Sequence, residues 1–116
     1  MTATTPKATR KKLRALTQVA YERELSRALA ALETEFKHWR EGQLDAFELS
    51  QRVHTFHDGA ARDLYKLYVL GEPELAVARA LELGFVSEAE TDADVLEAVA
   101  RLRAFLRERS APGEPE

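Results

Sequence analysis

Apolar residues recur at alternating spacings of three and four through the first third of the chain. The segment from Arg10 to Arg40 contains no glycine or proline, and its regularly spaced apolar positions are Tyr21, Leu25, Ala28, Leu32, Phe36 and Trp39. This spacing places their side chains on one face of an amphipathic helix. Gly42 follows as a left-handed C-cap, so we predict a first helix over about residues 10–41.

A second helix is predicted over about residues 45–70. Asp45 and Glu48 have the spacing of a capping box at its start. One apolar stripe then continues in a single helical phase: Leu49, Val53, Phe56, Ala60, Leu64 and Leu67. This continuity favours one helix through Asp58-Gly59, although that dipeptide can also interrupt or kink a helix. Because the turn at residues 41–44 is short, the two long helices form an antiparallel hairpin.

Two further helices are predicted after Gly71. Pro73 suits a first helical position and Gly84 a C-cap, which indicates a short helix over about residues 73–83. Two box-like patterns, beginning at Ser87 and Thr91, precede a C-terminal helix over about residues 92–109. The segments 1–9 and 110–116 are polar and contain helix breakers, so we predict disordered tails. The fold class is therefore all-α and bundle-like, with one helical domain over residues 10–109.

Composition narrows the function classes. With 116 residues and 45% hydrophobic content, the chain can bury one core. A net charge of −3 argues against a protein that coats itself in nucleic acid, and the lack of cysteine excludes disulfides and thiolate metal sites. No signal peptide or membrane span is recognisable, which predicts a cytoplasmic protein without membrane contact.

The segment His54-Thr-Phe-His57-Asp58 is the sharpest chemical feature. Histidines three apart share one helical face, so His54 and His57 can together hold a divalent transition metal ion, with Asp58 as a further ligand. The alternative is that both are partly buried polar residues, hydrogen-bonded to neighbours. No third histidine joins them, because His38 lies roughly 9 Å along the hairpin from His54 at 1.5 Å per residue.

A run of basic residues opens the first helix: Lys7, Arg10, Lys11, Lys12 and Arg14. No acidic residue precedes Glu22, and the predicted pairing of the helices leaves this segment projecting beyond the second helix. Such an arm can neutralise phosphates of a nucleic acid. The alternative is a solvated tail that aids solubility.

The predicted hairpin has more apolar surface than its two helices cover. A second stripe on helix two comprises Phe47, Ser50, His54, His57, Ala61, Leu64 and Tyr68, and Leu13 and Leu16 lie off the main stripe of helix one. A C-terminal helix can cover Leu13 and Leu16, or a partner can. We therefore predict a self-associating helical interaction module, with a dimer as the favoured state. Its predicted interface residues are Leu13, Leu16, Phe47, His54, Ala61, Tyr65 and Tyr68.

Catalysis has little support. The chain has no glycine-rich phosphate loop, no nucleophile elbow and no His-Glu-x-x-His helix, so no catalytic residue is assigned. The functional predictions are thus an interaction module, a nucleic-acid-associated protein that uses the basic arm, and a metal-binding protein that uses the histidine pair.

Overall fold

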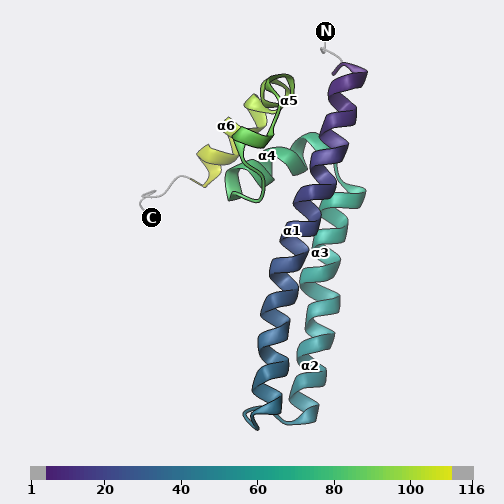
Figure 1. Cartoon of the computed structure of the whole chain (residues 1–116), viewed down its shortest axis with the longest axis vertical. Helices are drawn as coiled ribbons and strands as arrows, with labels where there is room; N and C mark the ends of the chain where they lie inside the picture. The colour runs from purple at the N-terminus through teal and green to yellow at the C-terminus, as the bar shows by residue number, and fades with distance from the viewer. Residues whose placement is uncertain (1–4, 111–116) are drawn as a thin grey trace. The chain divides into compact units, whose positions relative to one another are not determined.

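The computed structural model describes residues 5–110, and the structural statements below concern those residues. They contain helices and turns and no strand, so the predicted all-α fold is confirmed. The elements in chain order are α1 (Lys7–Arg40), α2 (Ala46–Phe56), η1 (His57–Ala61), α3 (Arg62–Tyr65), η2 (Lys66–Leu70), α4 (Pro73–Leu83), η3 (Glu88–Glu90), α5 (Ala93–Ala98) and α6 (Ala100–Arg109). Figure 1 labels the six α-helices. None of these helices is long and apolar enough to cross a membrane.

The helices pack as two compact units. The hairpin unit comprises residues 21–70, and the described residues of the terminal unit are 5–20 and 71–110. Helix α1 contributes its first turns to the terminal unit and the rest to the hairpin unit. The single domain predicted for residues 10–109 stays a prediction, because two units of one chain can still unfold in one transition.

Local signals at the hairpin turn act as predicted. Gly42 has φ +82°, and the amide of Gln43 donates to the His38 carbonyl at 2.8 Å, which ends α1. The Asp45 side chain accepts from the Glu48 amide at 2.8 Å, and the Glu48 side chain accepts from the Asp45 amide at 2.9 Å. This reciprocal capping box starts α2, and the two helices run antiparallel (Figure 1).

The second helix of the hairpin is continuous from Ala46 to Leu70, but two of its turns are π-helical. The first π turn, η1, lies at the Asp58-Gly59 dipeptide, where the sequence allowed an interruption. A π turn holds an extra residue, so it shifts the face that later residues present. After the half-buried Phe56, the next side chain with a Cβ on the half-buried side is therefore Ala61; Gly59 is also half-buried, while Ala60 is exposed.

The π turn explains why helix two carries two apolar stripes. Before the turn the inner face uses the first stripe, with Leu49 buried; after it, Tyr68 of the second stripe faces α1. The Tyr68 hydroxyl donates to Glu24 at 2.6 Å, and its ring stacks on Tyr21. The later part of the second stripe, from Ala61 to Tyr68, therefore lies inside the hairpin, whereas its earlier members are exposed: Phe47, Ser50, His54 and His57.

The terminal unit has the denser core. Its buried apolar residues come from α1, α4, α5 and the connections after α4 and α5: Leu13, Ala20, Ala76, Val77, Ala78, Ala80, Leu81, Val86, Val95 and Val99. Gly84, with φ +86°, ends α4 as predicted. The C-terminal helix predicted over residues 92–109 is divided at Val99, where φ is −106° and ψ is 5°.

The first helix begins at Lys7, earlier than the predicted Arg10, because its first turn is anchored. Thr9 is buried and its hydroxyl donates to Asp94 at 2.6 Å. Of the two predicted tails, residues 1–4 and 111–116 lie outside the described residues, whereas residues 7–9 of the first are helical.

Candidate functional site

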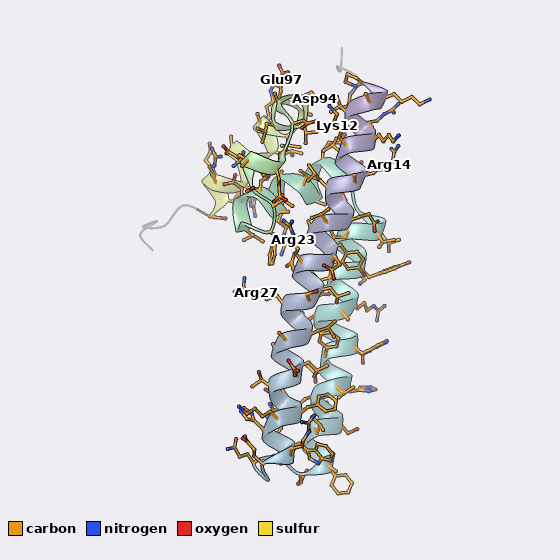
Figure 2. The ribbon with its side chains drawn as sticks, in the orientation of Figure 1. Lys12, Arg14, Arg23, Arg27, Asp94 and Glu97 are labelled. Atoms are coloured by element: carbon orange, nitrogen blue, oxygen red, sulfur yellow. The ribbon has the colours of Figure 1, made fainter. Side chains whose placement is uncertain are left out.

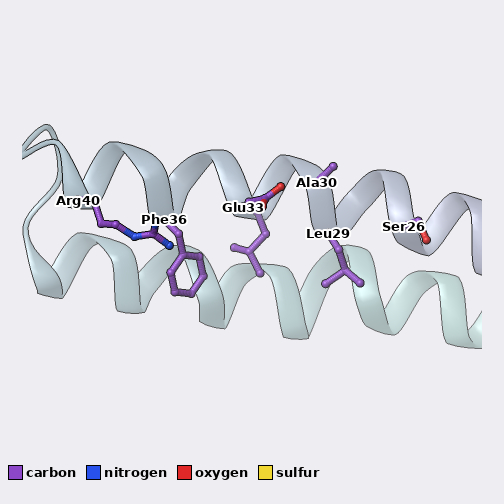
Figure 3. A pocket seen from close by; sticks show the side chains of 7 residues that line it. Ser26, Leu29, Ala30, Glu33, Phe36 and Arg40 are labelled. Atoms are coloured by element: carbon purple, nitrogen blue, oxygen red, sulfur yellow. The ribbon is translucent and has the colours of Figure 1, made fainter.

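The hairpin unit has a shallow open groove along α1 (Figure 3). It is lined by Ser26, Leu29, Ala30, Leu32, Glu33, Phe36 and Arg40. Leu29 is 46% exposed, whereas Leu32 and Phe36 are half-buried. The groove is therefore lined by an apolar strip, with Glu33 and Arg40 as its charged lining residues.

The hairpin leaves this strip open because two helices alone cannot enclose a core. In the described hairpin unit only Leu49, Leu64 and Tyr68 are buried. The apolar stripe predicted for α1 does face α2, but its members are half-buried or exposed. A hairpin of this kind gains stability when a further helical surface covers it.

The structure separates the predicted interface residues into three groups by burial. Leu13 and Tyr68 are buried within the chain, in the terminal and hairpin units respectively, and are not surface residues. Phe47 is 86% exposed, and Tyr65 and His54 are also exposed. Leu16 and Ala61 are half-buried. The interface remains a prediction for the residues that reach the surface.

The histidine pair is exposed and flanks one carboxylate. His54 Nε2 lies 3.5 Å from Asp58 Oδ2, and His57 Nδ1 lies 3.3 Å from Asp58 Oδ1. Between residues 5 and 110 no group of three or more metal-ligating side chains is placed to hold a metal ion. The three residues lie together on one stretch of helix, but a metal site would need ligands from another molecule. The predicted metal site stays a prediction.

The five predicted basic residues do not share one environment. Lys12 Nζ lies 3.0 Å from Asp92 Oδ2 and 3.2 Å from Asp94 Oδ1. The hydrogen bonds from Lys12 to Asp92 and Asp94 raise the pKa of Lys12, and the Thr9 hydroxyl, with help from Lys12, lowers the pKa of Asp94. Figure 2 shows Lys12 beside Asp94, with Arg14 on another side of α1.

The remaining four basic residues are exposed: Lys7, Arg10, Lys11 and Arg14. None of them forms a salt bridge or a side-chain hydrogen bond in the described part of the chain. Sequence reasoning treated all five cations alike, because the two aspartates that select Lys12 are about eighty positions away along the chain. Only the packing of α5 beside α1 within the terminal unit distinguishes them.

A second ion network in the terminal unit was not predicted. Arg103 Nε lies 2.6 Å and Arg107 Nε 2.8 Å from the two oxygens of Glu82, and Arg103 also contacts Glu88 at 2.9 Å. The Arg107 hydrogen bond, assisted by Arg103, lowers the pKa of Glu82 against the effect of burial. Two arginines four apart on α6 were the available signal, because they share a face. The network joins α4 to α6 and is structural.

Comparison with known proteins adds no relative: the chain matches no family model, no curated protein and no solved structure. Its function is therefore argued from its own surfaces.

Proposed function

We propose that the protein is a small helical interaction module that self-associates through the α1 groove of its hairpin unit. Two copies would lay these grooves against each other and form a four-helix arrangement. The observation that carries the proposal is the half-exposed apolar strip around Leu29, Leu32 and Phe36. Four-helix packing is a common way to complete such a hairpin.

The size of the hairpin face suits a dimer contact. Its 20 residues of α1, from Tyr21 to Arg40, span about 30 Å at 1.5 Å per residue. Two helices side by side are roughly 20 Å wide, so the face covers about 600 Å². Standard interfaces bury about 800 Å² on each partner, so this face is near the lower end of that class.

The polar residues of the groove are compatible with pairing of identical surfaces. Glu33 and Arg40 bring one acid and one base to the same groove. In a twofold dimer each copy presents the same surface, so both signs of charge are available to each partner. Ser26 and Ala30 are small, which permits close approach of a second helix.

Native mass spectrometry of untagged protein at micromolar concentration tests the proposal. We expect a dimer for the wild type and a monomer for Leu29→Glu, because a buried carboxylate at the centre of the contact is costly. The control is Leu83→Glu, which places the same change at a leucine 53% exposed on α4 of the terminal unit. It should remain a dimer.

Circular dichroism should show that both variants keep the wild-type helix content. A wild type that is strictly monomeric, or a Leu83→Glu variant that dissociates as readily as Leu29→Glu, contradicts the proposal. The first result shows that no self-association occurs; the second shows that the groove is not its location.

A further inference from the structure

Four unpaired cations occupy one face of the first turns of α1. Lys7, Arg10, Lys11 and Arg14 lie at positions i, i+3, i+4 and i+7 of a regular helix, and all four are exposed. That spacing aligns side chains along one side of a helix. We call these four residues the basic stripe. It is separate from the α1 groove, which begins at Ser26.

The fifth cation, Lys12, is directed elsewhere. Its ammonium group contacts Asp92 and Asp94, so two carboxylates already neutralise it. Thr9 and Leu13 are buried on the side of α1 that packs within the terminal unit. The fold therefore holds the helix by one side and presents the basic stripe on another.

The stripe has a mixed border at one edge. Arg10 and Arg14 line a shallow groove with Glu72 and Glu74 at the start of α4. Neither arginine is paired with these acids in the described part of the chain. The acids reduce the positive potential locally, so Lys7 and Lys11 are the more favourable contacts for an anion.

We propose that the basic stripe binds the phosphate backbone of double-stranded DNA without reading its sequence. From Lys7 to Arg14 the helix advances about 10 Å at 1.5 Å per residue. Along the axis of duplex DNA each strand carries one phosphate every 3.4 Å, so a helix lying parallel to that axis passes roughly three phosphates of one strand over that distance. Four exposed, unpaired cations are therefore enough to contact these phosphates.

The residues around the stripe explain the choice of partner. A membrane-surface helix needs an apolar face to insert beside its cations. Here Leu13 is 1% exposed, so the large apolar side chain nearest the stripe is unavailable to a bilayer. No Asn or Gln side chain lies between the cations to read adenine edges, so the proposal assigns their contacts to phosphates.

Fluorescence anisotropy with a labelled random-sequence DNA duplex tests the proposal at several salt concentrations. Each phosphate contact contributes about −0.9 to the slope of log affinity against log salt. We expect a slope no steeper than about −3.6 for each bound chain. Lys7→Gln/Lys11→Gln should reduce its magnitude by about 1.8 and weaken binding by roughly eightfold per contact at 100 mM salt.

Lys12→Gln is the matched control for the single variant Lys11→Gln, since each removes one positive charge from the same helical turn. Because its ammonium is held by Asp92 and Asp94, we expect the slope to change by less than 0.3, about a third of one contact. Glu74→Gln should strengthen binding by removing an acid from the border of the stripe. Thermal melts identify any variant that is unfolded at the assay temperature. If Lys7→Gln/Lys11→Gln is unfolded, Lys11→Gln alone, at an exposed position, replaces it.

Three results would overturn the proposal. One is no measurable binding at 20 mM salt, far below the ionic strength at which a four-phosphate contact is lost. Another is a loss of slope in Lys12→Gln as large as that in Lys11→Gln, which would indicate net charge and not the stripe. The third is equal affinity for vesicles of anionic phospholipid, with the same loss in Lys7→Gln/Lys11→Gln, which would assign the stripe to membranes.

Discussion

Tyr21 and Tyr68 stack across the two helices of the hairpin, with ring centroids 5.2 Å apart and an angle of 16° between the planes. Tyr21 lies on α1 and Tyr68 on the π turn η2, so the contact fixes the register between the helices. The Tyr68 hydroxyl also donates to Glu24 at 2.6 Å. One buried residue thus combines ring stacking with a hydrogen bond to a carboxylate.

We expect Tyr68→Phe to lower the free energy of unfolding by about 1–2 kcal/mol, since a hydrogen bond to a charged group is lost while the stacking remains. Tyr65→Phe is the control, because Tyr65 is exposed and forms no side-chain hydrogen bond in the described structure. It should change stability by less than about 0.5 kcal/mol. Chemical denaturation measures both, and equal losses would contradict the assigned role of the hydroxyl.

Replacing each of two glycines by alanine should change the stability of the protein in opposite directions. Gly59 lies inside η1 without a positive φ, and a Cβ there would meet no atom within 4 Å. Gly59→Ala should therefore stabilise the protein by about 0.5–1 kcal/mol, because the unfolded chain loses freedom. Gly42 has φ +82°, so Gly42→Ala should destabilise it by about 1 kcal/mol or more. Thermal melts of the pair check both signs, and a loss of stability in Gly59→Ala would contradict this account of the π turn.

Local patterns were enough to predict most of the fold. Gly42 and the Asp45/Glu48 box mark the hairpin turn, and Pro73 and Gly84 bound α4, since each acts on the backbone beside it. The start of α1 was placed too late because Thr9 is fixed by Asp94, a residue far away in sequence. Terminal residues are helical here because of packing, which a local pattern does not contain.

The candidate surfaces were less predictable. The sequence indicated a basic start, but the division between Lys12 and the basic stripe depends on where α5 lies in the terminal unit. It also gave helix two a wide apolar arc and did not foresee that a π turn brings Ala61 into the place expected for Ala60. Because both stripes are apolar, the sequence fits a regular 3.6-residue helical pattern with or without an inserted residue. The pattern therefore does not reveal the π turn.

The terminal unit should lose stability in acid. The pKa values of Glu82 and Asp94 are lowered from 4.5 and 3.8, by Arg107 in the first case and by Thr9 in the second. The unfolded chain therefore binds protons at a higher pH than the folded chain does. The stability that the ionised Glu82 and Asp94 contribute to the folded state is therefore complete above about pH 5. It is lost as the pH falls through the lowered pKa values.

Melting temperature measured from pH 7 to pH 3 tests this expectation. The wild type should be nearly constant down to about pH 5 and then fall. Glu82→Gln should have a lower melting temperature than the wild type at pH 7. The variant loses about 1 kcal/mol of unfolding free energy, because the half-buried ion network then lacks its central carboxylate. Its decline below pH 5 should be shallower than that of the wild type, and a parallel decline would show that Glu82 does not contribute.

The π turn makes one deletion in helix two tolerable. Phe56, Ala61, Leu64 and Tyr68 line the inner face at spacings of five, three and four. Deleting the exposed Ala60 changes these spacings to four, three and four, which is the pattern of a regular α-helix. We expect the deletion to convert η1 to α-helix, to keep the Tyr21–Tyr68 contact and to change stability by no more than about 1 kcal/mol.

Deletion of Ala31 is the control, because it removes an exposed alanine from a helix that has no π turn. There the lost residue rotates Leu32 and Phe36 by about 100° away from α2, and burial of roughly 1.5 kcal/mol or more per side chain is lost. Denaturation should show a loss of about 3 kcal/mol. If the two deletions cost the same, the π turn is not an inserted residue that the hairpin accommodates, and the two apolar stripes of helix two need another explanation.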